Sequence, residues 1–120
     1  MKKKILLADD EPDIAAVFRT ILETNDYQVI TASDGIEGIK KAVEENPDLI
    51  LLDVKMPNKD GLTTLRELKQ IESTKNIPVV MLTVSIGSPS MSECLKLGAK
   101  DYLFKTCDTQ TFLQYIKRYV

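Results

Sequence analysis

Aspartates stand at the ends of two short apolar runs, and these are the residues best suited to chemistry in this chain. Asp9 and Asp10 follow the run Ile5–Ala8, and Asp53 follows the run Leu49–Leu52. An aspartate carboxylate can act as a nucleophile and form an acyl phosphate. Carboxylate oxygens are also the ligands that Mg²⁺ prefers. These residue types indicate phosphoryl transfer assisted by a divalent metal.

The rest of the composition removes several other chemistries. The chain has no histidine, and its two cysteines, Cys94 and Cys107, have no metal-ligand or redox spacing. Histidine-based acid–base catalysis, Ser-His-Asp sites and His/Cys zinc sites are therefore excluded. We expect chemistry from carboxylates, hydroxyls and lysines, and we interpret the cysteines as small buried hydrophobic side chains.

The elements that must position these aspartates are predicted from alternating apolar runs and amphipathic segments. Five such strand–helix repeats predict an α/β fold, a single flavodoxin-like (βα)5 domain over residues 1–120 with helices on both faces of a parallel sheet. The predicted strands are Ile5–Ala8, Gln28–Ala32, Leu49–Leu52, Ile77–Thr83 and Tyr102–Phe104. The helices are predicted from Pro12 through Leu22, around a buried side formed by Ile36, Ile39 and Val43, and over Leu62–Ile71, Pro89–Leu97 and Thr109–Tyr119.

Sites in open parallel sheets form beyond the carboxyl ends of the strands, where the strand order reverses. We adopt the flavodoxin-like strand order 2-1-3-4-5, which is common among doubly wound sheets, and with that order this rule brings Asp9, Asp10 and Asp53 together. Carboxylates roughly 4 Å apart repel by about 4 kcal/mol per pair at an effective dielectric constant near 20. Lys105, which ends the fifth strand, would supply one positive charge, and Mg²⁺, with Mn²⁺ as a substitute, would supply the rest.

The bulk properties predict an ordinary globular protein. The chain has 120 residues, 43% of them hydrophobic and 28% charged, with a formal net charge of -2. This balance predicts no direct nucleic-acid partner and no membrane partner. The first apolar run is too short for a signal peptide, and we expect a cytoplasmic protein.

In order and spacing, these residues resemble the receiver domains of two-component response regulators. The match rests on Asp9-Asp10, on Asp53, on Met56-Pro57 followed by Asp60-Gly61, on Thr83, and on Gly98-Ala99 followed by Asp101-Tyr102-Leu103 and Lys105. The resemblance covers essentially the whole chain.

The resemblance implies a role for each matching residue. Asp53 would accept the phosphoryl group. Asp10 would be a direct Mg²⁺ ligand, with the Lys55 backbone carbonyl as another and Asp9 acting mostly through water. The remaining roles fall on the switch hydroxyl Thr83, the phosphate-binding Lys105 and the rotating aromatic Tyr102.

The resemblance also implies partners. A sensor histidine kinase or a phosphotransfer protein would donate to Asp53. An output domain or partner protein, or a second copy in a phosphorylation-dependent homodimer, would then be recognised through helix 4, strand 5 and helix 5.

Three positions depart from the family pattern. Thr106 replaces the usual proline after the lysine, and a cis peptide bond there would cost roughly 2.5–4 kcal/mol. Val84 replaces a small residue after Thr83 and could narrow access to the site. Lys55 places an ammonium beside the acceptor, and we hypothesise that it alters dephosphorylation.

Two alternatives belong to other functional classes. A receiver-like interaction module that does not use phosphate would bind its partner equally well after Asp53→Asn. A nucleotide or flavin enzyme on the same fold would need a glycine-rich phosphate loop, and neither G-x-G-x-x-G nor G-x-x-x-x-G-K-[ST] occurs in the chain.

Overall fold

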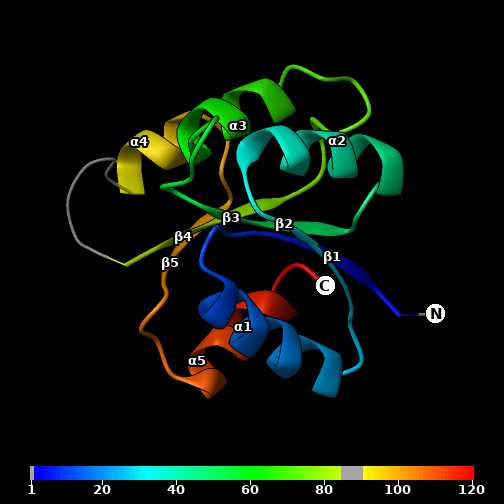
Figure 1. Ribbon diagram of the computed structural model, residues 1–120, viewed down its shortest axis with the longest axis vertical. Helices are drawn as coiled ribbons and strands as arrows, with labels where there is room; N and C mark the ends of the chain where they lie inside the picture. The colour runs from blue at the N-terminus through cyan, green and yellow to red at the C-terminus, as the bar shows by residue number, and fades with distance from the viewer. Residues whose placement is uncertain (1, 85–90) are drawn as a thin grey trace.

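The computed structural model describes residues 2–84 and 91–120, and these form one parallel sheet with helices on both faces. The elements in chain order are β1 (Lys4–Ala8), α1 (Pro12–Thr24), β2 (Gln28–Ala32), α2 (Gly35–Glu45), β3 (Leu49–Asp53), α3 (Gly61–Leu68), β4 (Val79–Thr83), α4 (Met91–Lys96), β5 (Asp101–Phe104) and α5 (Thr109–Lys117). The strand order is β2-β1-β3-β4-β5. The predicted flavodoxin-like α/β fold is confirmed. Figure 1 shows α1 and α5 on one face of the sheet and α2, α3 and α4 on the other.

Each strand contributes to two apolar layers because successive side chains point to opposite faces. Leu6, Ile50 and Leu52 pack in the cluster that includes Leu65 and Leu68 of α3. The opposite cluster contains the other strand positions together with Phe18 of α1 and Phe112 of α5, whose rings stack at 4.6 Å. This double burial explains why the central strands read as continuous apolar runs.

The strand register brings the chemistry-bearing strand ends to one edge of the sheet. Ala8 pairs with Leu52, the residue before Asp53, and Asp53 itself pairs with Leu82 of β4. Thr83 pairs with Phe104, the residue before Lys105. Residues that are far apart in sequence therefore leave the sheet side by side.

Two of the three residues that we predicted to be buried on the second helix are exposed. Ile36 and Val43 are 56% and 46% exposed, and only Ile39 packs against the core. The buried residues of α2 are Gly35, Gly38 and Ala42. These small side chains let the helix lie close to its neighbours, and this face is rotated from the one that the large apolar residues mark. Val17 of α1 is also exposed, although its spacing from the other apolar residues of that helix predicts a buried position.

Several predicted boundaries differ by one to three residues. α3 ends at Leu68 instead of Ile71, and β4 begins at Val79, after Pro78. α5 ends at Lys117, two residues before the predicted end at Tyr119. The predicted start of the fourth helix at Pro89 lies outside the described residues.

The prediction that both cysteines are buried is correct for one of them. Cys94 is fully buried, whereas Cys107 is half-buried against the α1–α5 layer. Within residues 2–84 and 91–120, no helix combines the length and the apolar character needed to cross a bilayer.

Gly61, the first residue of α3, is expected to tolerate no side chain. A Cβ there would lie 2.1 Å from the Asp53 carbonyl oxygen and 2.8 Å from Val54 Cα, and backbone atoms cannot yield cheaply. Gly61→Ala should lower the free energy of unfolding by about 2–3 kcal/mol or more. Gly38→Ala is the matched control, because its Cβ would meet Ala8 Cβ at an ordinary 3.6 Å. The control should stabilise the helix by about 0.5–1 kcal/mol. Urea unfolding followed by circular dichroism measures both, and equal effects would contradict the close approach at Gly61.

Candidate functional site

A single buried ammonium lies among three carboxylates at the carboxyl edge of the sheet. Lys105 Nζ lies 2.9 Å from Asp53 Oδ2, 3.0 Å from Glu11 Oε1, and 3.1 and 3.0 Å from the two oxygens of Asp9. The Lys105 side chain is only 2% exposed, and the side chains of Asp9 and Asp53 are 0% and 6% exposed. The structure thus brings together three of the predicted site residues and directs the lysine inward.

Local backbone bonds hold Asp53 at the end of β3. The next residue, Val54, donates its N–H to the Leu82 carbonyl of β4 at 3.0 Å, which continues the strand pairing past Asp53. The Lys55 N–H donates to Asp53 Oδ1 at 3.4 Å, a long bond. Lys105 is fixed in the same way, because its N–H donates to the Thr83 carbonyl at 2.7 Å. Backbone hydrogen bonds therefore hold both Asp53 and Lys105 at the ends of the strands.

Four acidic residues are close enough to share one cation. Asp9, Asp10, Glu11 and Asp53 each offer a carboxylate oxygen, and these atoms all lie within 4.8 Å of one another. Asp9 Oδ2 is buried and has no hydrogen-bond donor among the described residues, although the Lys105 ammonium lies near it. An all-oxygen set with excess negative charge fits a hard divalent cation such as Mg²⁺.

Glu11 is the site residue that the sequence reasoning missed. It directly follows the acidic pair, and its backbone N–H donates to Asp9 Oδ1 at 3.0 Å. This bond turns the chain so that the Glu11 carboxylate faces Lys105. The available signal was a third acidic residue in an unbroken run, Asp9–Glu11, after a buried strand.

The pKa values of the central pair reflect an excess of negative charge. Burial raises the pKa of Asp53 to about 7, and the neighbouring Asp9 adds to the rise, while Lys105 opposes both. Burial alone would lower the pKa of Lys105, but its hydrogen bonds to Asp53, Glu11 and Asp9 outweigh burial and raise it. One ammonium does not neutralise the cluster, so the site retains affinity for another positive charge.

The pocket at this cluster has a volume of about 160 Å³. It is lined by Asp10, Glu11, Asp53, Val54, Lys55, Thr83 and Val84. Thr83 is buried, whereas Lys55 and Val84 are exposed at the rim. The space is large enough for a small group such as phosphoryl to reach the Asp53 carboxylate.

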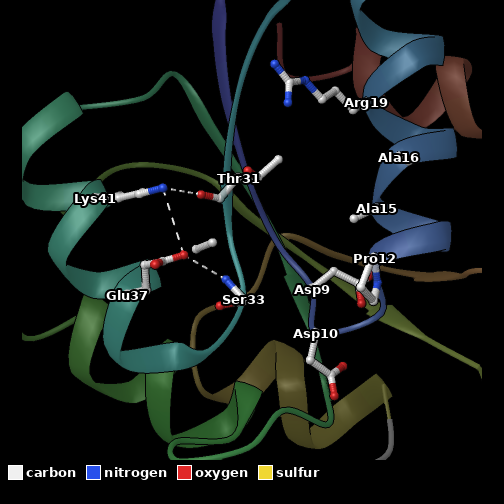
Figure 2. Close-up of a pocket in the computed structure, with 11 residues that line it drawn as sticks. Asp9, Asp10, Pro12, Ala15, Ala16, Arg19, Thr31, Ser33, Glu37 and Lys41 are labelled. Atoms are coloured by element: carbon white, nitrogen blue, oxygen red, sulfur yellow. Dashed lines mark hydrogen bonds and ion pairs between the residues drawn. The ribbon is translucent and has the colours of Figure 1, made fainter.

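A larger cavity of about 330 Å³ lies on the other side of Asp9, between α1 and β2–α2. Figure 2 shows the Asp10 side chain directed away from the two cations of this cavity, Arg19 and Lys41. Both cations are already engaged, Arg19 with Glu23 and Lys41 with the Thr31 carbonyl. Asp53, Lys55 and Thr83 line the smaller cavity and not this one.

The remaining predicted residues lie around the site without entering the carboxylate cluster. Met56 and Tyr102 are buried in the layer under α2–α4, and the Tyr102 ring meets Phe104 edge-on at 5.8 Å. Pro57 and Thr106 are exposed. The roles given to these residues, and to the Lys55 carbonyl, stay predictions.

Residues 5–117 match the family described as the response regulator receiver domain. The chain belongs to this family, and it is a signalling domain of two-component response regulators.

Particular relatives agree with this assignment. The chain is 45% identical over 105 residues to the alkaline phosphatase synthesis transcriptional regulatory protein PhoP of Bacillus subtilis, covering 88% of this chain and 43% of that protein. It thus spans less than half the length of this relative. The chemotaxis protein CheY4 of Vibrio cholerae matches over 100% of both chains with a TM-score of 0.93 and 29% identity.

A third relative bears on the metal. The receiver domain of sensor histidine kinase PA1611 from Pseudomonas aeruginosa matches over 99% of this chain and 98% of that chain. The TM-score is 0.91 and the identity 28%, and that structure has a magnesium ion coordinated in its active site cleft.

Mg²⁺ binding to this chain is expected to tighten as the pH rises toward 8. With a pKa of about 7, Asp53 is mostly protonated at pH 6, and the proton must leave before the carboxylate can face a cation. The apparent affinity should fall by up to about ten-fold per pH unit below pH 7 and level off above it. Isothermal titration calorimetry at pH 6, 7 and 8 measures this, and an affinity independent of pH would contradict the raised pKa.

Proposed function

We propose that this domain accepts a phosphoryl group on Asp53 in a Mg²⁺-dependent reaction and thereby changes the surface it offers to a partner. The observation that carries the proposal is the buried Asp53 carboxylate in contact with Lys105, inside a cluster of four acidic residues. Burying an ionisable group is energetically costly, and groups buried at such a cost are often found at functional sites.

The chain's own residues would provide the nucleophile and two of the hydrogen-bond donors for this transfer. An Asp53 oxygen attacks the phosphorus of a phosphohistidine, so that an O–P bond forms as the N–P bond breaks. The imidazole leaves with the electron pair of the N–P bond. Lys105 lies 2.9 Å from Asp53 Oδ2 and would donate to a phosphoryl oxygen, and the Thr83 hydroxyl would donate to another.

Asp10, Asp53 and the Lys55 carbonyl would hold Mg²⁺, with Asp9 acting mostly through water. When bound, the ion supplies positive charge that offsets the oxygens of the transferring group. Asp9 is buried and ion-paired with Lys105, whereas the Asp10 side chain is exposed, where it can approach a cation from solvent.

The partners follow from this reaction. A sensor histidine kinase or phosphotransfer protein would be the donor. An output domain, a partner protein or a second copy of the chain would read the surface formed by α4, β5 and α5. This surface exposes Met91, Leu95 and Phe104, which gives it apolar character. The phosphoryl group on Asp53 would carry a charge of about -1.5 to -2 at the carboxyl edge of the sheet, in place of the single charge of the free carboxylate.

The test is intact mass after incubation with acetyl phosphate and Mg²⁺, with a matched sample containing EDTA. We expect the mass of one added phosphoryl group with Mg²⁺ and a much slower gain with EDTA. A chain that gains no mass while still binding its partner would instead favour the phosphate-independent interaction module.

Lys55 and Val84 are expected to set how long the phosphoryl group lasts. Both border the pocket from its exposed rim, where a water molecule would have to approach Asp53. Removing either side chain in Lys55→Ala or Val84→Ala should change autodephosphorylation a few-fold, about 1 kcal/mol in the barrier. Loss of mass over time measures it, and rates equal to the wild type in both variants would remove the idea.

A further inference from the structure

One side-chain hydrogen bond joins the loop after Asp53 to the start of α2. Asn58 Nδ2 donates to Asp34 Oδ2 at 2.7 Å, across 24 residues of sequence. Asp34 Oδ1 accepts the backbone N–H of Glu37 at 2.8 Å and so caps α2. A single carboxylate therefore connects a helix end to the loop that borders the site.

The loop side of this connection is folded back on β3. Asn58 has a φ of 67°, a left-handed conformation that asparagine adopts more readily than most residues. The Lys59 N–H donates to the Pro57 carbonyl at 2.6 Å, and the Gly61 N–H donates to the Val54 carbonyl at 2.9 Å. These bonds close residues 54–61 into one compact loop. Lys55 belongs to this loop, lines the pocket and donates its N–H to Asp53 Oδ1 at 3.4 Å.

The α2 side of the connection is anchored by close packing. A Cβ on Gly35 would lie 2.0 Å from Thr64 Oγ1 and 2.5 Å from the Lys59 carbonyl oxygen, so the helix start touches both the loop and α3. The Ser33 N–H donates to Glu37 Oε1 at 2.9 Å, which adds a second hydrogen bond across the start of α2. Asp34 therefore holds Asn58 from a fixed support.

We propose that Asp34 and Asn58 are positioning residues for the metal site: their hydrogen bond holds loop 54–61 so that the Lys55 carbonyl is placed for Mg²⁺ before the ion arrives. The inference rests on the proposed function and deepens it. Without the bond, metal binding would have to order the loop itself, and that cost would appear as weaker affinity.

Two variants remove the bond with little other change. Asn58→Gly keeps the left-handed backbone and loses the amide. Asp34→Ser keeps a capping oxygen for α2 and loses the second carboxylate oxygen. Each should bind Mg²⁺ about five-fold more weakly by isothermal titration calorimetry. The double variant should be no weaker than either single one, because both remove the same bond.

Asn46→Gly is the matched control, because Asn46 also has a positive φ, 48°, but sits at the far end of α2. Its Mg²⁺ affinity should equal that of the wild type. Amide hydrogen exchange gives a second readout. Lys59 and Gly61 should exchange faster in both single variants while the N–H groups of β1 stay protected, which a general loss of stability would not produce.

The outcomes separate this inference from the proposed function. Wild-type affinity in Asn58→Gly and Asp34→Ser, or losses that add in the double variant, would overturn the positioning role. A wild-type chain that binds no Mg²⁺ would overturn the proposed function itself, and with it the metal-positioning role. The exchange rates of Lys59 and Gly61 would then still decide whether the bond holds the loop.

Discussion

Lys105→Met should both destabilise the fold and slow phosphorylation more than any other single change away from Asp53. The ammonium contacts three carboxylates and is the only cation that does so among residues 2–84 and 91–120. Its loss leaves Asp9 and Asp53 buried without a counter-charge. Removing one partner of a buried ion pair costs about 3–5 kcal/mol. Losing the donor to the phosphoryl oxygens should slow acetyl phosphate turnover by about 10²–10³-fold.

The destabilisation of Lys105→Met should grow with pH. Asp53 already has a folded-state pKa raised from 3.8 to about 7. Between these two pKa values the carboxyl is ionised in the unfolded chain but still protonated in the folded one. The free energy of unfolding therefore falls as the pH rises from about 4 to about 7. Without Lys105 the pKa of Asp53 in the folded state should rise further, so the loss of stability should continue to a higher pH.

Urea unfolding at pH 5 and pH 8 without metal measures this dependence. Lys55→Met is the matched control, because it removes an exposed lysine beside the same pocket, and its stability should stay within about 0.5 kcal/mol of the wild type. Equal stability of Lys105→Met and Lys55→Met would contradict the buried ion cluster.

Asp53→Asn should abolish phosphorylation by acetyl phosphate while the fold persists. The amide has nearly the shape of the carboxylate, and its oxygen can still accept from Lys105, but it is not the nucleophile that an acyl phosphate requires. The variant should also lose much of the decline in metal-free stability between pH 4 and pH 7, because that decline comes from the raised pKa of Asp53.

The control for this variant is Asp26→Asn, the same chemical change at an exposed turn with a φ of 69°, which asparagine also tolerates. Asp26→Asn should gain one phosphoryl group at the wild-type rate. A full mass gain in Asp53→Asn would assign the chemistry to another residue and contradict the proposal.

The sheet could be predicted from the sequence because parallel strands buried on both faces have a distinctive pattern. The run Leu49–Leu52 is apolar throughout and is fully buried, and the rule for carboxyl ends then placed Asp53 beside Asp9. Lys105 could be assigned to the same edge because it follows a short strand. Its contact with Asp9 and Asp53 could not be predicted from the strand order alone, because β3 and β4 separate β5 from β1 and the lysine side chain must extend inward to reach them.

The failures have physical causes. The face of α2 was misjudged at Ile36 and Val43 because large apolar side chains usually mark the buried side, whereas here glycine and alanine allow close approach. Glu11 was missed because a strand-periodicity argument places only the residue that ends the strand. Its role depends on a turn that the Asp9 side chain makes with the Glu11 N–H.

The most direct test of the central claim is to trap the phosphorylated residue chemically. The chain is incubated with acetyl phosphate and Mg²⁺ and then treated with borohydride, which reduces an aspartyl phosphate to homoserine. Peptide mass spectrometry then locates the converted residue. We predict homoserine at position 53 and unconverted aspartate at positions 9 and 10. Conversion at either of those positions, or no conversion in a chain whose mass shows a phosphoryl group, would contradict the account.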